Sequence, residues 1–202
     1  MQYDRFESAA TQEQGQSALR RGEILAAAAT LFAEHGFHGA SMRDIGERVG
    51  LLKGSLYVHI ANKDEILVEI VGDTARRLNA AVSPVLLATA RPSDKLRMAL
   101  KAHLLFASSN QNSMFVLQHE SKHLTGQPHM WICEWRLRYQ QLWWSAVDVG
   151  VRCGDLRQDL DIACATDMLL AAANLNATFD MTSDTGAVAD RRWEVLRGGL
   201  LP

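Results

Sequence analysis

Cationic side chains are concentrated in one short stretch of the chain, residues 41–63. This stretch holds four Lys or Arg and only two acids: Arg43, Arg48, Lys53 and Lys63 against Asp44 and Glu47. Within it, Gly54 and Ser55 stand near the start of a short predicted helix, where small side chains let backbone N–H groups approach a phosphate. Cations, hydroxyls and exposed amides are the groups that hold a nucleic-acid backbone. The stretch therefore indicates phosphate binding, although the whole chain has a formal net charge of −2.

Two short helices joined by a glycine must position these groups. Ser41 is a suitable N-cap, and Asp44 three residues later supplies the acid of a capping box. Apolar residues then recur at helical spacing: Met42, Ile45 and Val49. Gly50 suits the left-handed position that follows a helix, and a second helix of barely two turns comes after it. This order predicts a helix-turn-helix, whose second helix enters the major groove of DNA.

One segment resembles the DNA-binding signature of the TetR family of bacterial transcription regulators. It runs from Val49 to Leu67, VGLLKGSLYVHIANKDEIL, and residues 24–36, ILAAAATLFAEHG, resemble the first helix of that family. The resemblance implies DNA contacts from Ser41, Arg43, Lys53, Gly54, Ser55, Tyr57, His59 and Lys63. The segment departs from the signature at Leu52, Val58 and Ile60, of which Ile60 is a tolerable apolar replacement for the usual Phe.

Four further residues have two interpretations each. Arg20 and Arg21, at the start of the first predicted helix, would either reach the DNA backbone or minor groove or be solvated charges. Leu52 and Val58 would either contact a thymine methyl group or pack inside the helix-turn-helix. Arg20, Arg21 and Leu52 are included among the candidate DNA contacts.

Periodicity along the rest of the chain is helical. We therefore predict an all-α fold, with an N-terminal three-helix helix-turn-helix domain and a C-terminal helical domain for ligand binding and dimerisation. The predicted ranges are a mobile, Gln-rich arm at 1–17, the DNA-binding domain at 18–65 and the C-terminal domain at 66–202. The first helix should begin near Leu19 and end at Gly36, and an aromatic helix should run from Pro128 to about Cys153.

Residue types that support catalysis or metal binding do not form a set. His119 and His123 have the i, i+4 spacing of a metal-binding pair, but the sequence supplies no clear third ligand. There is no G-x-S-x-G elbow and no glycine-rich phosphate loop. The cysteines, Cys133, Cys153 and Cys164, have no metal-ligand spacing. We predict no metal, no cofactor, no catalytic residue, buried reduced thiols, and a cytoplasmic protein without a membrane contact.

Aromatic residues recur every four positions in the predicted long helix: Trp131, Trp135, Tyr139 and Trp143. Such a stripe is either core or the lining of a ligand pocket, and the family resemblance implies an inducer site in this part of the chain. We expect Trp131, Trp135 and Tyr139 to line it. Other candidates are the soft or aromatic Met98, Phe106, Met114, Phe115 and Met168, with His103 and Asn110 as polar anchors.

Charge in the C-terminal domain favours an apolar ligand. Residues 158–189 contain no Lys, Arg or His, so an anionic group would need a cation elsewhere: Lys95, Arg97, Lys101, Arg136 or Arg138. We expect a small hydrophobic or aromatic metabolite, with an acyl-CoA thioester as the second choice. The segment Gln118–Lys122, with Gln127–Pro128, resembles TetR members that sense acyl- or steroid-CoA intermediates.

The last two predicted helices are the expected dimer interface. Their apolar stripes could instead be intramolecular core, but the resemblance implies a four-helix contact between two copies here. The candidate residues are Ala165, Met168, Leu169, Ala172, Leu175, Phe179, Trp193, Leu196 and Leu200.

These features predict a homodimeric transcriptional regulator, a repressor that binds palindromic operator DNA and is released by a small-molecule effector. Two hypotheses of other classes remain open at this point. A helical cytosolic hydrolase or metal-binding protein would show turnover or bound zinc. A DNA-binding protein without an effector would show no change of DNA affinity with any ligand.

Overall fold

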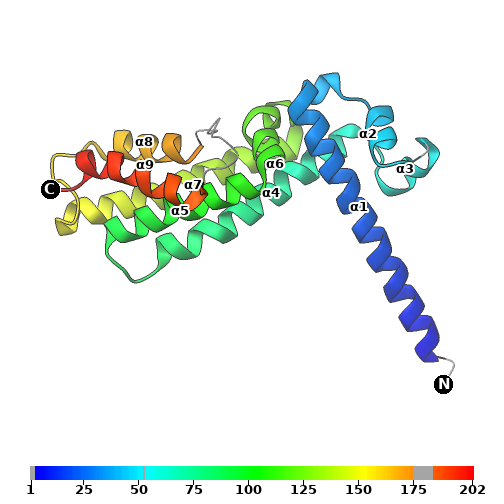
Figure 1. The fold of residues 1–202 in the computed structure, drawn as a ribbon, viewed down its shortest axis with the longest axis horizontal. Helices are drawn as coiled ribbons and strands as arrows, with labels where there is room; N and C mark the ends of the chain where they lie inside the picture. Colours follow the sequence, from blue (N-terminus) through cyan, green and yellow to red (C-terminus); the bar gives the residue numbers. More distant parts are fainter. Residues whose placement is uncertain (1–2, 52, 175–183) are drawn as a thin grey trace. The chain divides into compact units, whose positions relative to one another are not determined.

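Every regular element in the described part of the chain is a helix. The computed structural model describes residues 3–51, 53–174 and 184–202, with side chains from Ser17 onward except that of Lys53. The α-helices are α1 (Tyr3–Gly39), α2 (Met42–Arg48), α3 (Lys53–His59), α4 (Lys63–Leu87), α5 (Pro92–Ser109), α6 (Gln111–Phe115), α7 (Gly126–Cys153), α8 (Ile162–Asn174) and α9 (Thr185–Leu200) (Figure 1). A π-helical turn, η1 (Val116–Glu120), and a 3-10 turn, η2 (Ser121–His123), lie between α6 and α7. The predicted all-α fold is confirmed.

The chain forms two compact units. Unit 1 consists of Met1–Thr74 and Asn112–His129, and unit 2 consists of Ala75–Gln111 and Met130–Pro202. The helix-turn-helix therefore shares its unit with residues 112–129, which the sequence had placed in the C-terminal domain. The assignment of DNA binding to residues 18–65, and of ligand binding and dimerisation to residues 66–202, stays a prediction.

The first helix starts earlier than expected. It begins at Tyr3, so residues 3–17 continue α1 and are not the irregular arm that the sequence suggested. This segment has no proline and is rich in Glu, Gln and Ala. Because adding a residue to an existing helix is far easier than starting one, good helix formers extend α1 backwards. Its other end is as predicted, since Gly36 leaves helical geometry with φ 74° and ψ 163°.

The core of unit 1 joins the helix-turn-helix to its flanking helices. Phe32 of α1, Ile45 of α2 and Leu56 of α3 are fully buried. Ile60, which replaces the usual Phe of the family signature, is 1% exposed and fills the core as expected. Phe32 and Phe37 meet edge to face with their ring centroids 5.3 Å apart.

Unit 2 is a bundle in which α5 packs against α8 and α9 (Figure 1). Trp143 of α7, Leu100 of α5 and Leu169 of α8 are completely buried in it. Gly150 permits the closest approach, because a Cβ there would lie 2.6 Å from the Leu156 side chain and 3.1 Å from that of Pro92. A larger residue at position 150 would push the loop after α7 away from α5.

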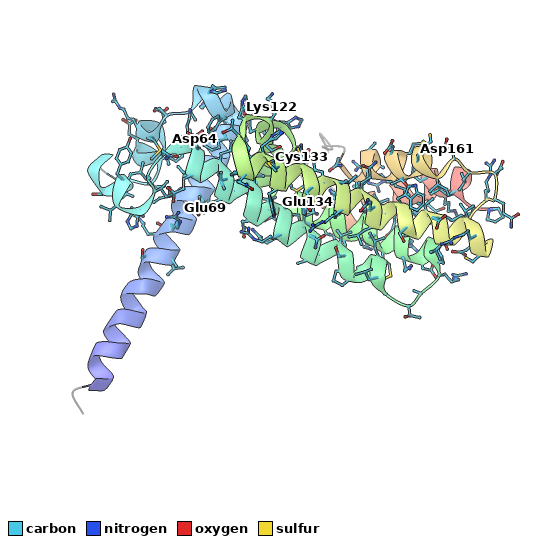
Figure 2. The ribbon with its side chains drawn as sticks, turned by 180° about the vertical axis from the view of Figure 1, so that it is seen from behind. Asp64, Glu69, Lys122, Cys133, Glu134 and Asp161 are labelled. Carbon is cyan, nitrogen blue, oxygen red and sulfur yellow. The ribbon has the colours of Figure 1, made fainter. Side chains whose placement is uncertain are left out.

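The surface of the helices corrects one expectation about the thiols. Cys133, Cys153 and Cys164 are all exposed, so the predicted burial of the thiols is wrong. Cys133 precedes Glu134 on α7 (Figure 2), and both side chains are exposed. None of the described helices has both the length and the apolar character that a membrane span needs.

Candidate nucleic-acid interface and ligand site

Local capping builds the helix-turn-helix as the sequence predicted. The Ser41 N–H donates to Asp44 Oδ2 at 2.9 Å and the Asp44 N–H donates to Ser41 Oγ at 3.2 Å, which completes a capping box on α2. The Ser41 hydroxyl, which donates to Asp44 Oδ2 at 2.7 Å, lowers the pKa of Asp44 most, and the Ser41 N–H lowers it further. Gly50 takes the left-handed conformation at φ 67°. Gly46 is required by packing, because a Cβ there would lie 3.1 Å from the Leu51 carbonyl oxygen.

One face of helix α3 is exposed and carries both polar and apolar side chains, and its opposite face is buried. Val58 is 82% exposed and Tyr57 is 44% exposed, and Ser55 is exposed as well. Among the described residues, nothing lies within 4 Å of a Cβ built on Gly54, so they leave the backbone there uncovered. Of the two interpretations of Val58, core packing is therefore excluded. Leu52 and the Lys53 side chain lie outside the described residues.

Two cations predicted near DNA bond to the ends of the helix-turn-helix helices. Arg20 Nη2 donates to the carbonyl oxygen of Val49, the C-cap of α2, at 2.9 Å. Arg21 Nη1 donates to the carbonyl of His59, the last residue of α3. Cations at helix C-termini satisfy unpaired carbonyls and oppose the helix dipole. Neither arginine is a simple solvated charge.

Arg21 also binds the first two turns of α4. It pairs with Glu65 and Glu69, and Glu69 lies on α4 beside α1 (Figure 2). These hydrogen bonds, the stronger with Glu69, raise the pKa of Arg21 well above its usual value. The pKa of Glu65 is lowered, first by the Ala61 N–H and then by Arg21. One side chain of α1 thus fixes α3 and α4 together.

Lys63 is also used inside unit 1. Its Nζ donates to the carbonyl oxygens of Phe37 at 2.7 Å and Ala40 at 2.8 Å, where α1 ends. It also lies 4.5 Å from the centroid of the Phe37 ring, as a cation–π contact. The other predicted contacts, Arg43 and His59, differ in exposure: Arg43 is exposed and His59 is half-buried.

The sequence missed a buried carboxylate in unit 1. Glu120, at the end of the π-helical turn, is 7% exposed, and its Oε2 accepts from the Phe37 N–H at 2.8 Å. His123 Nε2 lies 3.5 Å from the same oxygen, and His123 Nδ1 lies 3.1 Å from His38 Nε2. His119 has a different neighbour, Phe115, whose ring centroid lies 4.5 Å away with the two planes tilted by 41°. No helical periodicity could reveal Glu120, because π turns change the face on which a residue lies.

Three of the predicted ligand residues come together in unit 2. Tyr139 Oη and His103 Nδ1 are 3.0 Å apart, and Trp135 stacks on Tyr139 with centroids at 5.3 Å. Trp143 meets the Tyr139 ring edge to face at 6.4 Å. We call these four residues the aromatic cluster. Burial lowers the pKa of His103 to about 4 and raises that of Tyr139, so both side chains are neutral at pH 7.

The aromatic cluster contains polar atoms without well-formed hydrogen bonds. Within the described ranges, three buried side-chain nitrogens have no well-formed hydrogen bond: His103 Nε2, Trp135 Nε1 and Trp143 Nε1. The Asn174 side chain still acts on the His103 ring, and Trp143 acts on Tyr139. All three belong to this cluster. Buried polar groups in folded proteins are nearly always paired, so such a concentration requires an explanation.

The other predicted ligand residues lie elsewhere. Met98 and Met168 are each 58% exposed, and Trp131 is 39% exposed. Met114 and Phe115 belong to unit 1. Phe106 and Asn110 are in unit 2 but contact Arg77, whose guanidinium lies 5.5 Å from the Phe106 ring and donates to Asn110 Oδ1 at 2.8 Å.

Most predicted dimer residues are core within one copy. The buried members are Ala165, Leu169, Ala172, Trp193 and Leu200. Leu196 is half-buried and Met168 is exposed, and Leu175 and Phe179 lie outside the described residues. These five residues are buried within one copy, and their part in a dimer interface stays a prediction. The sequence stripe could not separate these alternatives, because the same spacing serves either contact.

Comparison with known proteins places the chain in a family. The model of bacterial regulatory proteins, tetR family, matches residues 24–70, and that of the Tetracyclin repressor-like, C-terminal domain matches residues 89–178. The HTH-type transcriptional repressor KstR2 of Mycobacterium tuberculosis is 33% identical over 149 residues, which cover 73% of this chain and 74% of the relative.

Solved structures agree with the sequence comparison. The ketosteroid transcriptional regulator KstR2 of Mycobacterium tuberculosis has a TM-score of 0.85 at 25% identity, covering 91% of this chain and 95% of that one. AibR, in a complex with isovaleryl coenzyme A and operator DNA, shares the fold with a TM-score of 0.78 at 23% identity, covering 87% and 97%. The chain belongs to the TetR family of bacterial regulatory proteins and is a DNA-binding transcriptional regulator.

Proposed function

We propose that this regulator is a repressor that binds a two-fold symmetric DNA site as a homodimer and leaves it when a hydrophobic, ring-bearing metabolite binds in unit 2. One observation carries the proposal. The helix-turn-helix of unit 1 is capped and exposed, whereas the aromatic cluster of unit 2 contains buried polar atoms without well-formed hydrogen bonds. Ligand release follows if the effector binds better to a state of the dimer whose recognition helices are wrongly spaced.

On the DNA side, the exposed face of α3 supplies the contacts. Ser55, Tyr57 and the open backbone at Gly54 hold phosphates, and the exposed Val58 meets a thymine methyl. Ser41, Arg43, His59, Leu52 and Lys53 remain proposed contacts from the family resemblance. Arg20, Arg21 and Lys63 act differently in this proposal, because their hydrogen bonds hold the helices that present the contacts.

On the effector side, the aromatic cluster suits a flat or alicyclic ring. The first relative is called a repressor, and its solved structure a ketosteroid regulator, which supports a polycyclic ligand. An acyl-CoA thioester stays the second choice. Two cations that could hold its phosphates, Arg97 and Lys101, both pair with Asp190.

The homodimer should form on the outer face of α8 and α9. Val195 is 80% exposed and Met168 is 58% exposed, whereas Ala172 faces the core of its own chain. We expect Val195→Arg to yield monomers by light scattering while the far-UV circular dichroism stays unchanged. Retention of the dimer in Val195→Arg would move the interface off this face.

Two smaller points complete the proposal. The family and its relatives are regulators, which supports a chain that binds DNA and an effector without catalysing a reaction. It should act in the cytoplasm, where the DNA is.

The test is selection of bound DNA from a random pool by the full-length protein, repeated with steroid ketones, hydrophobic acids and acyl-CoA thioesters. The expected result is an inverted repeat whose half-sites lie about one helical turn apart, about 34–36 Å, or a multiple of that distance. One class of compound should abolish its enrichment. A pool without an enriched repeat, or enrichment that no compound changes, would contradict the proposal.

A further inference from the structure

We propose that Glu120 is a positioning residue for DNA recognition, although it lies far from the helix-turn-helix in the sequence. Its carboxylate holds the chain between the break in α1 and the N-cap of α2, residues 36–41, which we call the α1–α2 corner. This inference rests on the proposed function and adds a residue to its DNA-binding side. All the side chains concerned belong to unit 1.

The α1–α2 corner starts at the residue pair that Glu120 meets. Gly36 has the non-helical angles φ 74° and ψ 163°, and the next residue, Phe37, donates its N–H to Glu120 Oε2 at 2.8 Å. A hydrogen bond from a backbone N–H to a carboxylate is charge-assisted and is stronger than one between neutral groups. Glu120 therefore anchors the first residue after the break.

The carbonyl groups of the corner are held by a second charged side chain. Lys63 Nζ donates to the carbonyl oxygen of Phe37 at 2.7 Å and to that of Ala40 at 2.8 Å. The N–H and the carbonyl of Phe37 are thus bonded to side chains of opposite charge. Because Ser41, the N-cap of α2, follows Ala40 directly, these bonds determine where α2 begins.

The surroundings of Glu120 keep its carboxylate on this N–H. Glutamate is rarely buried without partners, because burial removes the hydration of its charge, and Glu120 is only 7% exposed. His123 Nε2 lies 3.5 Å from Glu120 Oε2, and the His123 ring stacks on Phe37 with the centroids 5.6 Å apart. His123 Nδ1 in turn lies 3.1 Å from His38 Nε2. His123 therefore contacts both the carboxylate and the residue that the carboxylate anchors.

Reading of the major groove requires a fixed position of α3, which follows α2 after a short turn. If the corner is released, α2 and α3 can take several positions, of which DNA selects one. The apparent affinity then falls by the fraction of molecules in the competent state. Loss of the acceptor at position 120 should lower the affinity for the selected DNA roughly five- to hundredfold.

The experiment measures anisotropy of the selected DNA with full-length variants that circular dichroism shows to be folded. Glu120→Gln keeps an acceptor oxygen at the same reach and removes the charge. Glu120→Asp keeps the charge and is one methylene shorter, and Glu120→Leu removes the acceptor. Ser121→Ala is the matched control, because Ser121 is 1% exposed and its Oγ donates to the Leu117 carbonyl at 2.7 Å, away from the corner.

We expect Glu120→Leu and Glu120→Asp to bind the selected DNA roughly five- to hundredfold more weakly than the wild type, and Glu120→Gln to stay within about threefold. Ser121→Ala should lower the urea midpoint and bind DNA as the wild type does. The inference is overturned if the folded Leu or Asp variant keeps full affinity, if Asp binds better than Gln, or if Ser121→Ala loses as much affinity as Glu120→Leu. Should Glu120→Leu not fold, the comparison of Asp with Gln tests the inference by itself.

DNA binding by the wild type separates this inference from the function on which it rests. If the wild type binds no selected inverted repeat, the proposed function fails. If the wild type binds it and the three Glu120 variants bind equally well, only the positioning role of Glu120 fails.

Discussion

The buried and half-buried polar groups of unit 1 are paired, whereas several of those in unit 2 are not. In unit 1, Arg20, Arg21 and Lys63 each donate to carbonyl oxygens at the end of a helix, and Glu120 accepts the Phe37 N–H. In unit 2, by contrast, lie all the buried side-chain nitrogens that lack well-formed hydrogen bonds in the described residues.

The polar groups around the helix-turn-helix are paired within the protein, whereas several of those in the aromatic cluster are not. Paired cations at helix ends fix the relative positions of α2, α3 and α4, so the helix-turn-helix is organised before DNA arrives. Unpaired donors lower stability and are retained in natural proteins mainly where function needs them.

The largest expected effect is a loss of stability at acidic pH that His103 causes. Between pH 6.5 and about 4 the unfolded chain protonates this imidazole and the folded chain does not, because its folded pKa is about 4. Stability should therefore fall as the pH falls through this window, by roughly 3 kcal/mol for a shift of this size. Urea unfolding from pH 4 to 7 measures it. His103→Phe should flatten the dependence, and equal pH slopes for wild type and His103→Phe would refute a neutral His103.

The next effect concerns Glu120 of unit 1. Glu120→Leu leaves the Phe37 N–H without its acceptor and should lower the free energy of unfolding by roughly 1–3 kcal/mol. Glu120→Gln keeps a carbonyl oxygen and should lose less. The urea unfolding midpoints of wild type, Glu120→Leu and Glu120→Gln measure these losses of stability. A Leu variant as stable as wild type would show that the contact does not organise unit 1.

A smaller effect distinguishes positioning from contact. Arg43 is exposed, and its side chain pairs with Glu47 on the same helix, so Arg43→Ala should lower the salt dependence of DNA binding by about one phosphate contact. Arg21→Ala should leave that slope unchanged and destabilise unit 1 by roughly 1–2 kcal/mol, since the arginine is about one third exposed. Anisotropy titrations at several salt concentrations separate them. A slope reduced by Arg21→Ala would make Arg21 a phosphate contact.

The smallest effect is in the ligand-free protein. Trp135→Phe removes an unpaired donor, so the melting temperature should stay the same or rise by about 1–3 °C. Trp144→Phe should not raise it. Marked destabilisation by Trp135→Phe would indicate that the indole N–H has a structural partner, and the contrast between the units would weaken.

Local signals made the helix-turn-helix predictable. The Ser41–Asp44 capping box, the left-handed Gly50 and the break at Gly36 depend on neighbours in the sequence, and all three are present. Four-residue spacing also placed Trp135 and Tyr139 on one face of α7, where they stack.

Roles that depend on distant partners were not predictable. Arg21 meets Glu69 forty-eight positions later, and Glu120 meets Phe37 across eighty-three, distances over which no spacing rule operates. Apolar spacing on α8 likewise could not show whether Leu169 packs on its own chain or on a partner. The resemblance identified the helix-turn-helix, but it did not show that Lys63 bonds to the end of α1.

The separate roles of unit 1 and unit 2 can be tested by anisotropy of the selected DNA, titrated with full-length protein with and without a steroid ketone, for wild type and Trp135→Phe. The expected result is specific binding by both proteins, release from wild type by the ketone, and release from Trp135→Phe only at about three- to tenfold higher ketone concentration. The same release curve for both proteins, or no release at any concentration, would contradict the assignment of DNA binding to unit 1 and of ligand recognition to the aromatic cluster of unit 2.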